Sequence, residues 1–155
     1  MNRRAAREIL LHIIYEAGYG GNPRELLEDR LTPDSFASLG EELEVYAHPL
    51  PRSQHPYLKM VCSQMEEKCE IIDPLIEKYS ANWKLTRLSR ISAAILRIAV
   101  FEIYFIENIP LKVSINEAVE IAKKYDTDEA PAFINGLLGA LVKGEGITSA
   151  PVSEL

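Results

Sequence analysis

The sequence has few of the residues on which metal and redox sites depend. Among 155 residues there are two cysteines and three histidines. Cys62 and Cys69 lie about 10 Å apart along an expected helix, which is too far for a disulfide bond. No CxxC pair occurs, and His12, His48 and His55 lack the spacing of metal ligands. We therefore expect two reduced, buried or half-buried thiols, no metal site and a cytoplasmic protein.

Enzyme motifs are also missing. There is no glycine-rich phosphate loop, because Gly136 and Gly139 lie inside a helical pattern, where close packing of another helix is the better interpretation. No Ser/His/Asp or Cys/His arrangement can be recognised. Adjacent carboxylates such as Glu41 and Glu42 point in different directions on a helix and are typical of solvated surface. The sequence thus predicts no catalytic residues, no cofactor and a protein that is not an enzyme.

Long apolar runs and a surplus of positive charge are both absent. The most apolar stretch, 93–106, is interrupted by Arg97 and Glu102 and is too short to cross a bilayer, so we expect no membrane association. No apolar leader with a cleavage site is visible at the N-terminus. The net charge is −6. Any binding of nucleic acid must therefore come from a local basic patch, and not from the field of the whole molecule.

The sequence does contain helical periodicity along most of its length, and no sustained alternation that would predict strands. We expect a single domain over residues 1–143, in which 32–56 forms an irregular, acidic and exposed loop, although 36–46 has some helical character. Residues 144–155 are expected to be a flexible tail. The expected helices cover residues 2–19, 23–31, a stretch from 57 onward, 86–107, a stretch to 125, and 128–143. A new helix is expected to start at Asp73-Pro74, and a capping box at Ser114 and Glu117 is expected to open the helix that ends at 125. The helix at 86–107 is expected to be the longest and to be central.

Three arginines form the most basic part of the sequence. Arg3 and Arg7 are four residues apart and share a helical face, with Arg4 beside them. Guanidinium groups bind phosphates and stack on bases, and cations at a helix N-terminus oppose the helix dipole. Charge alone nevertheless favours a solvated terminus over RNA binding. Tyr15 lies two turns beyond Arg7, and its spacing alone favours packing over stacking on a base.

Two asparagines lie in apolar-rich helical stretches. A buried amide needs hydrogen-bond partners, so Asn116 and Asn135 are expected to bridge helices, with ligand contact as the alternative.

Five sequence blocks, taken together, resemble the NusB antitermination family. They occur in the family's order and spacing and cover most of residues 3–143. The blocks are Arg-Arg-x-Ala-Arg-Glu at 3–8, Trp-Lys-Leu-x-Arg-Leu at 83–88, Ala-Ile-Leu-Arg-Ile-Ala-x-x-Glu at 94–102, Ile-Pro-x-Lys-Val-x-Ile-Asn-Glu-Ala at 109–118 and Phe-Ile-Asn-Gly at 133–136.

The resemblance implies an all-α fold of about seven helices in two small packed bundles. It also implies a factor that binds boxA RNA of nascent ribosomal transcripts together with the small-subunit ribosomal protein NusE. Other Nus factors and RNA polymerase join indirectly, and premature termination is suppressed. A basic partner would supply the positive field that this acidic chain lacks. Because some family members dimerise, a homodimer is the resting form that the resemblance suggests.

Site residues follow from the resemblance position by position. The RNA-binding positions are Arg3, Arg4, Arg7, Tyr15, Lys112 and Phe133, and the partner-binding positions are Arg87, Ser92 and Arg97. One stretch departs from the family: Glu129-Ala130-Pro131-Ala132 stands where members often carry Asp-Ser-x-Lys. Loss of that lysine should remove one phosphate contact and flatten the salt dependence by about one unit.

Two alternatives to an antitermination factor remain. A NusB-like module fused to an rRNA methyltransferase requires a downstream catalytic domain with a glycine motif, and the chain ends at residue 155 without one, so we expect this alternative to fail. A NusB-like helical adaptor with weak or lost RNA specificity stays open because of the altered stretch at 129–132. We also expect the fold to survive alanine at Arg3, Arg4 and Arg7, because these positions precede most of the first apolar stripe.

Overall fold

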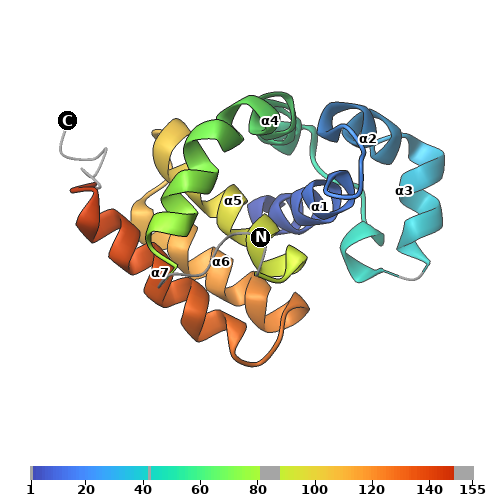
Figure 1. Ribbon diagram of the computed structural model, residues 1–155. Coiled ribbons are helices and arrows are strands. Elements are labelled where there is room, and N and C mark those ends of the chain that lie inside the picture. The colour runs from blue at the N-terminus through green and yellow to red at the C-terminus, as the bar shows by residue number, and fades with distance from the viewer. Residues whose placement is uncertain (1, 42, 81–87, 149–155) are drawn as a thin grey trace. The chain divides into compact units, whose positions relative to one another are not determined.

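The computed structural model describes residues 2–41, 43–80 and 88–148. Within these ranges the chain forms seven α-helices and two short 3-10 helices and contains no strand, which confirms the predicted all-α fold (Figure 1). No helix in the described ranges is both long and apolar enough to cross a membrane. The elements are α1 (Asn2–Ala17), α2 (Pro23–Arg30), α3 (Pro33–Gly40), η1 (Glu44–Tyr46), η2 (Arg52–Gln54), α4 (His55–Lys78), α5 (Arg90–Phe105), α6 (Leu111–Tyr125) and α7 (Ala130–Gly144).

The chain divides after Glu67 into two compact units. The first contains α1 to α3, both 3-10 helices and the beginning of α4, and the second contains the rest of α4 with α5, α6 and α7. These units correspond to the two small helical bundles that the family resemblance implies.

The first unit is built on the apolar stripe of α1. Five of the six apolar positions predicted for this stripe are at most 5% exposed, because residues spaced three and four apart share one helical face, while the sixth, Ala17, is only half-buried. Asn22 caps α2, and its side-chain oxygen accepts the amides of Arg24 and Glu25 at 2.9 and 3.3 Å, as expected for an N-cap before proline. The buried stripe consists of Ala6, Ile9, Leu10, Ile13 and Ile14.

The stretch 32–56 is more regular than predicted. Thr32 caps α3, and Pro33 supplies a favourable first helical residue. Tyr46 is only 2% exposed, and its hydroxyl lies 3.0 Å from Nδ1 of His12 and accepts Nη1 of Arg30 at 2.9 Å. The expectation of an exposed irregular loop was therefore wrong at Tyr46. The local sequence predicts little regular structure here, but contacts of Tyr46 with His12 and Arg30, which are distant in the chain, bury its side chain.

Helix α4 continues through the position where a new helix was predicted. Pro74 lies inside α4. Proline removes one helical hydrogen bond, but Ile72 and Ile76 on either side are completely buried, and their packing favours an uninterrupted helix. The carboxylate of Asp73, the expected cap, instead pairs with Arg97. With 24 residues against 16, α4 exceeds α5, which was predicted to be the longest helix.

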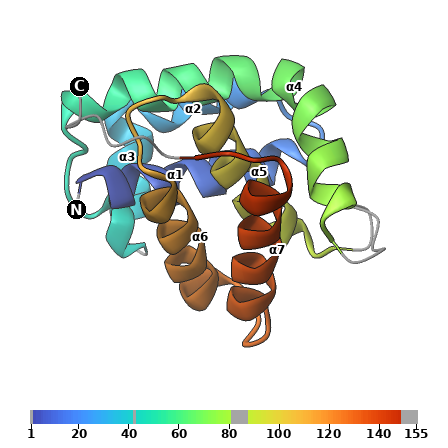
Figure 2. The ribbon, with the colours of Figure 1, turned by 90° about the vertical axis from the view of Figure 1, so that its left-hand side faces the viewer.

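In the second unit, α6 packs most extensively against α7 and also against α5. Figure 2 shows α6 and α7 side by side. Helix α6 begins at Leu111 after Pro110, so the capping box predicted at Ser114 was wrong. Pro110 already supplies an extended backbone at the cap, and the Ser114 hydroxyl donates instead to Oε1 of Glu102 at 2.9 Å. Both side chains are buried, and the bond joins α6 to α5.

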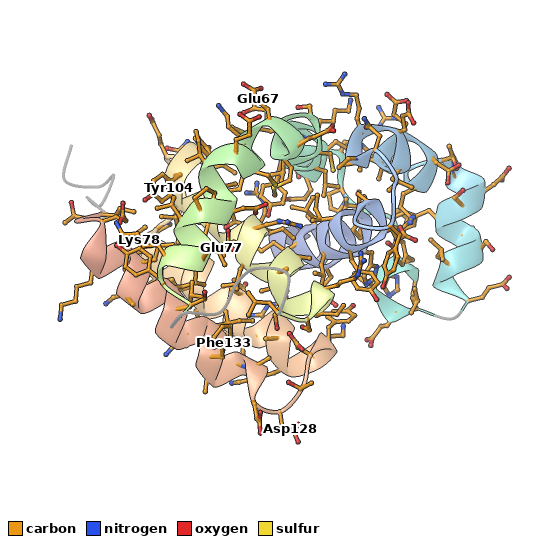
Figure 3. All side chains as sticks on the ribbon, viewed as in Figure 1. Glu67, Glu77, Lys78, Tyr104, Asp128 and Phe133 are labelled. Atoms are coloured by element: carbon orange, nitrogen blue, oxygen red, sulfur yellow. The ribbon has the colours of Figure 1, made fainter. Side chains whose placement is uncertain are left out.

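The end of α7 is held by a small polar cluster. Gly144 is the last residue of α7, one position beyond the predicted end. The next residue, Glu145, accepts a hydrogen bond from Nζ of Lys78 at 2.8 Å and another from the hydroxyl of Tyr79. Figure 3 shows Lys78 beside the C-terminal end of α7. Residues 149–155 lie outside the described residues, so the flexible tail stays a prediction.

The two thiols agree with the sequence analysis. Both cysteines are free, Cys62 being buried and Cys69 half-buried. Burial raises the pKa of the Cys62 thiol to about 12. The group is therefore neutral near pH 7 and serves as a small packing side chain.

Candidate nucleic-acid interface

The three predicted RNA-binding arginines of α1 occupy different environments. Nε of Arg3 donates to Oε1 of Gln54 at 2.6 Å, and its guanidinium lies 4.3 Å from the centre of the Tyr57 ring. Arg7 is only 4% exposed, whereas Arg4 is exposed. Of the three cations, Arg4 is therefore the one that the fold presents most fully to a ligand in solution.

These environments change what an alanine substitution would report. A cation over an aromatic ring contributes to stability, and removal of a buried charged side chain is destabilising because it leaves the groups around it without a partner. Arg3 and Arg7 thus combine any ligand contact with a structural role, and we expect Arg7 to be the exception to the predicted tolerance of the fold. Residue type and spacing do not predict this difference, because all three positions carry the same charge on the same helix.

A pair of tyrosines lies at the C-terminal end of α1. The hydroxyls of Tyr15 and Tyr19 are 3.0 Å apart, and their rings meet edge to face with centres 5.4 Å apart. Tyr15 is half-buried, while Tyr19 is 63% exposed. Tyr19 was missed in the sequence because it follows the helix among glycines, although the spacing of four from Tyr15 was visible. The pair presents an aromatic surface suited to stacking.

In the second unit, Lys112 borders an open recess of about 620 Å³ between α6 and α7. Asn116 and Asn135 line the same recess. Both asparagines are exposed, so the expectation that they bridge helices from buried positions was wrong. Their helical faces turn away from the core because the buried residues of α6 and α7 occupy the opposite positions. The remaining lining residues are Val113, Ile115 and Glu117.

Phe133 and the stretch that departs from the family lie at the start of α7. Phe133 is half-buried and is not among the residues that line the recess. Ala130 is 5% exposed at the first position of α7, so its small side chain is packed into the fold. Glu129 precedes the helix without a side-chain cap. This end of α7 therefore offers an aromatic edge but neither the hydroxyl nor the lysine expected from the family.

Two of the three predicted partner-binding positions, Ser92 and Arg97, are engaged in hydrogen bonds within the second unit. The Ser92 hydroxyl donates to Asp126, and Ser92 is 6% exposed. Arg97 forms a two-pronged ion pair with Asp73, at 2.9 and 3.0 Å. Burial lowers the pKa of Arg97, but the hydrogen bond and charge of Asp73 outweigh it and raise the pKa overall. Arg87 lies outside the described residues.

The first unit contains a further recess of about 580 Å³ between α2 and α4. Arg24 and Lys59 contribute cations to its lining and Glu28 contributes a carboxylate, while Leu27 and Cys62 make part of it apolar. Across the described ranges, no group of three His, Cys, Asp or Glu side chains is arranged to hold a metal ion. The chemistry that the described surfaces offer is binding through cations, amides and aromatic rings.

An all-helical fold with such surfaces defines a helical binding protein. A sequence model of the NusB family matches residues 4–143. The transcription antitermination protein NusB of Thermoanaerobacter sp. is 41% identical over 148 residues, which cover 95% of this chain and 94% of the relative. The chain belongs to the NusB family.

Solved structures agree with this assignment. A NusB from T. maritima superposes with a TM-score of 0.77 at 26% identity, covering 96% of this chain and 93% of that one. A chain in the crystal structure of antitermination factors NusB and NusE with dsRNA gives a TM-score of 0.73 at 24% identity, covering 92% and 97%. At that identity the second likeness shows the fold alone. The predicted family, fold and non-enzymatic class are thereby confirmed.

Proposed function

We propose that this protein is a transcription antitermination factor that binds boxA-type RNA of nascent ribosomal transcripts together with NusE and suppresses premature termination. The observation that carries the proposal is the family match over residues 4–143, with relatives named as antitermination proteins over nearly the whole chain. The presence of NusE and dsRNA with a chain of the same fold supports the choice of partners.

Each unit contributes residues that bind RNA. In the first, Arg4 contacts phosphate and the Tyr15–Tyr19 pair offers a stacking surface. In the second, Lys112 contacts phosphate and the half-buried Phe133 offers an aromatic edge. Arg3 and Arg7 complete the basic segment, and their internal packing holds α1 in the conformation that presents Arg4.

NusE compensates for the negative charge of this chain. With a net charge of −6, the protein alone attracts RNA weakly at long range. A basic ribosomal protein bound beside it would raise the association rate and add phosphate contacts. We assign α5 to that partner, with Ser92 and Arg97 fixing the shape of the helix surface and Arg87 as a further predicted contact. Other Nus factors and RNA polymerase join through this complex in the cytoplasm. In the absence of its partners, the protein rests as a homodimer.

The discriminating experiment measures binding of a boxA RNA and a scrambled RNA of equal length, each with and without NusE. We expect tighter binding of boxA RNA and a larger preference when NusE is present. Equal affinity for both RNAs in both conditions would refute specific RNA recognition. That result would favour the helical adaptor, the alternative suggested by the missing hydroxyl and lysine at 129–132.

A further inference from the structure

Four residues in the middle of α6 and α7 are poor helix formers without a structural reason to be there. They are Asn116 in α6 and Asn135, Gly136 and Gly139 in α7. Asparagine and glycine are less favourable than alanine in a helix interior. Elsewhere the chain uses such residues structurally, since Asn22 caps α2. None of these four residues caps a helix, although each lowers the helix propensity of its position.

The glycines do not allow a close contact between helices. A Cβ atom placed on Gly136 or on Gly139 would meet nothing within 4 Å. The earlier interpretation that another helix approaches here was therefore wrong. Both glycines leave a strip of α7 backbone open, and Gly139 is one helical turn from Asn135 on the same side of the helix.

The asparagines converge on one place. Asn116 and Asn135 come from different helices and line the same recess, together with Lys112 one turn before Asn116. Both amides are exposed, and neither side chain forms a hydrogen bond with the residues that the structure describes. Glu117 adds a carboxylate to the lining. Donors, acceptors and one cation thus face a recess of about 620 Å³.

We propose that this recess reads the edge of an unpaired RNA base, with Asn116 and Asn135 as the reading residues. Each amide has a donor and an acceptor, which is the pattern needed to pair with a base edge. Lys112 binds a neighbouring phosphate. The strip of α7 left open by Gly136 and Gly139 gives room for the sugar and backbone of the nucleotide. This inference rests on the proposed function.

The lining favours RNA over a protein segment. Binding energy between proteins concentrates at large apolar or aromatic anchors. Among the residues that line the recess there is no aromatic ring, and the most exposed large apolar side chain is Val113, at 40%. Two amides beside the apolar side chains of Val113 and Ile115, without such an anchor, suit a base, which has a polar edge and a flat apolar face.

The test uses the full-length protein with NusE and compares boxA RNA with scrambled RNA. We expect Asn116→Ala and Asn135→Ala each to weaken boxA binding about tenfold while changing binding of scrambled RNA little. Lys112→Ala should instead weaken both RNAs to a similar degree. Asn108→Ala is the matched control, because Asn108 is an exposed asparagine of the same unit outside the recess lining, and it should leave both affinities unchanged.

Thermal unfolding of the same variants separates reading from folding. Alanine is the better helix former, so Asn116→Ala, Asn135→Ala and Gly139→Ala should leave the midpoint unchanged or raise it. Gly139→Ala should also weaken binding of boxA RNA severalfold by filling the open strip. A variant that binds RNA less well while unfolding at a higher temperature is the signature of this proposal.

Three results would overturn it. If the asparagine variants keep the wild-type preference for boxA, the recess does not read a base, although the proposed function stands. If they lose NusE binding with RNA binding unchanged, the recess is a protein contact. A fall of several degrees in the unfolding midpoint would make the amides structural. A wild-type protein that does not discriminate between the two RNAs would instead refute the proposed function itself.

Discussion

The basic segment of α1 and the recess between α6 and α7 use polar side chains in opposite ways. In the first unit, Arg3 packs over Tyr57 and donates to Gln54, and Arg7 is almost fully buried. In the second, Lys112 and two asparagines face an open recess. The segment with more charge in the sequence therefore presents only part of that charge to solvent. Charge density along the chain is a poor guide to a binding surface until burial is known.

The largest effect should come from Arg7. We expect Arg7→Ala to lower the free energy of unfolding by about 2–4 kcal/mol, because it removes a buried charged group and leaves its surroundings without a partner. The exposed Arg4→Ala is the matched control and should change stability by less than about 0.5 kcal/mol. Urea denaturation measures both. Equal, small effects would show that Arg7 is as dispensable as a surface residue.

Two glycines sharpen the comparison further. A Cβ atom on Gly40 in the first unit would lie 2.6 Å from the backbone oxygen of Tyr46, whereas one on Gly139 meets nothing. Gly40→Ala should therefore destabilise the protein by about 1–3 kcal/mol. Gly139→Ala should stabilise it by about 0.5–1 kcal/mol. Thermal denaturation of the pair checks both signs, and a destabilised Gly139→Ala would contradict the open surface of α7.

RNA binding should respond to the exposed cation of each unit. Arg4→Ala and Lys112→Ala should each weaken RNA binding severalfold and reduce the slope of log affinity against log salt by about 0.7 for a single-stranded RNA. The double variant should lose about twice that slope. Arg52→Ala, an exposed arginine of η2, serves as the control with an unchanged slope. If one single variant reduced the salt slope as much as the double variant does, RNA would contact only the unit that contains that residue.

The smallest effect concerns pH and the end of α7. Hydrogen bonds from Lys78 and Tyr79 lower the pKa of Glu145. A carboxyl group with a lowered pKa stabilises the folded state above its ordinary pKa of 4.5, and this contribution disappears as the pH falls through the lower folded value. Glu145→Gln should thus be slightly less stable than wild type at pH 7, with the difference shrinking in acid. Glu129→Gln, the control, should show no such pH-dependent difference in stability. If Glu145→Gln remained less stable than wild type in acid by the same amount, the ion pair would not explain the effect.

Much of the fold was readable from local patterns. Apolar spacing predicted the buried face of α1, and the Asn22-Pro23 pair predicted the start of α2. Local signals failed where tertiary packing opposed them. The cap signal at Asp73-Pro74 gave way to the burial of Ile72 and Ile76 in a continuous α4.

The candidate site was harder to predict from the sequence, because tertiary packing decides which side chains are exposed. Arg4 and Lys112 were named from family motifs, but Tyr19 was missed and Asn116 and Asn135 were assigned to the interior. A side chain's type and spacing indicate which neighbours share its helical face. They do not indicate whether that face is covered, since coverage depends on residues distant in the chain.

The sequence by itself determined the helical class, most helix positions, the absence of a disulfide between Cys62 and Cys69, and the NusB resemblance. All of these depend on short-range periodicity or on ordered motifs. Only the tertiary structure decided that Arg7 is buried, that Ser114 donates to Glu102 and does not cap a helix, and that the glycines of α7 face open space. Burial and long-range hydrogen bonds arise when separate segments pack together, and no local pattern contains that information.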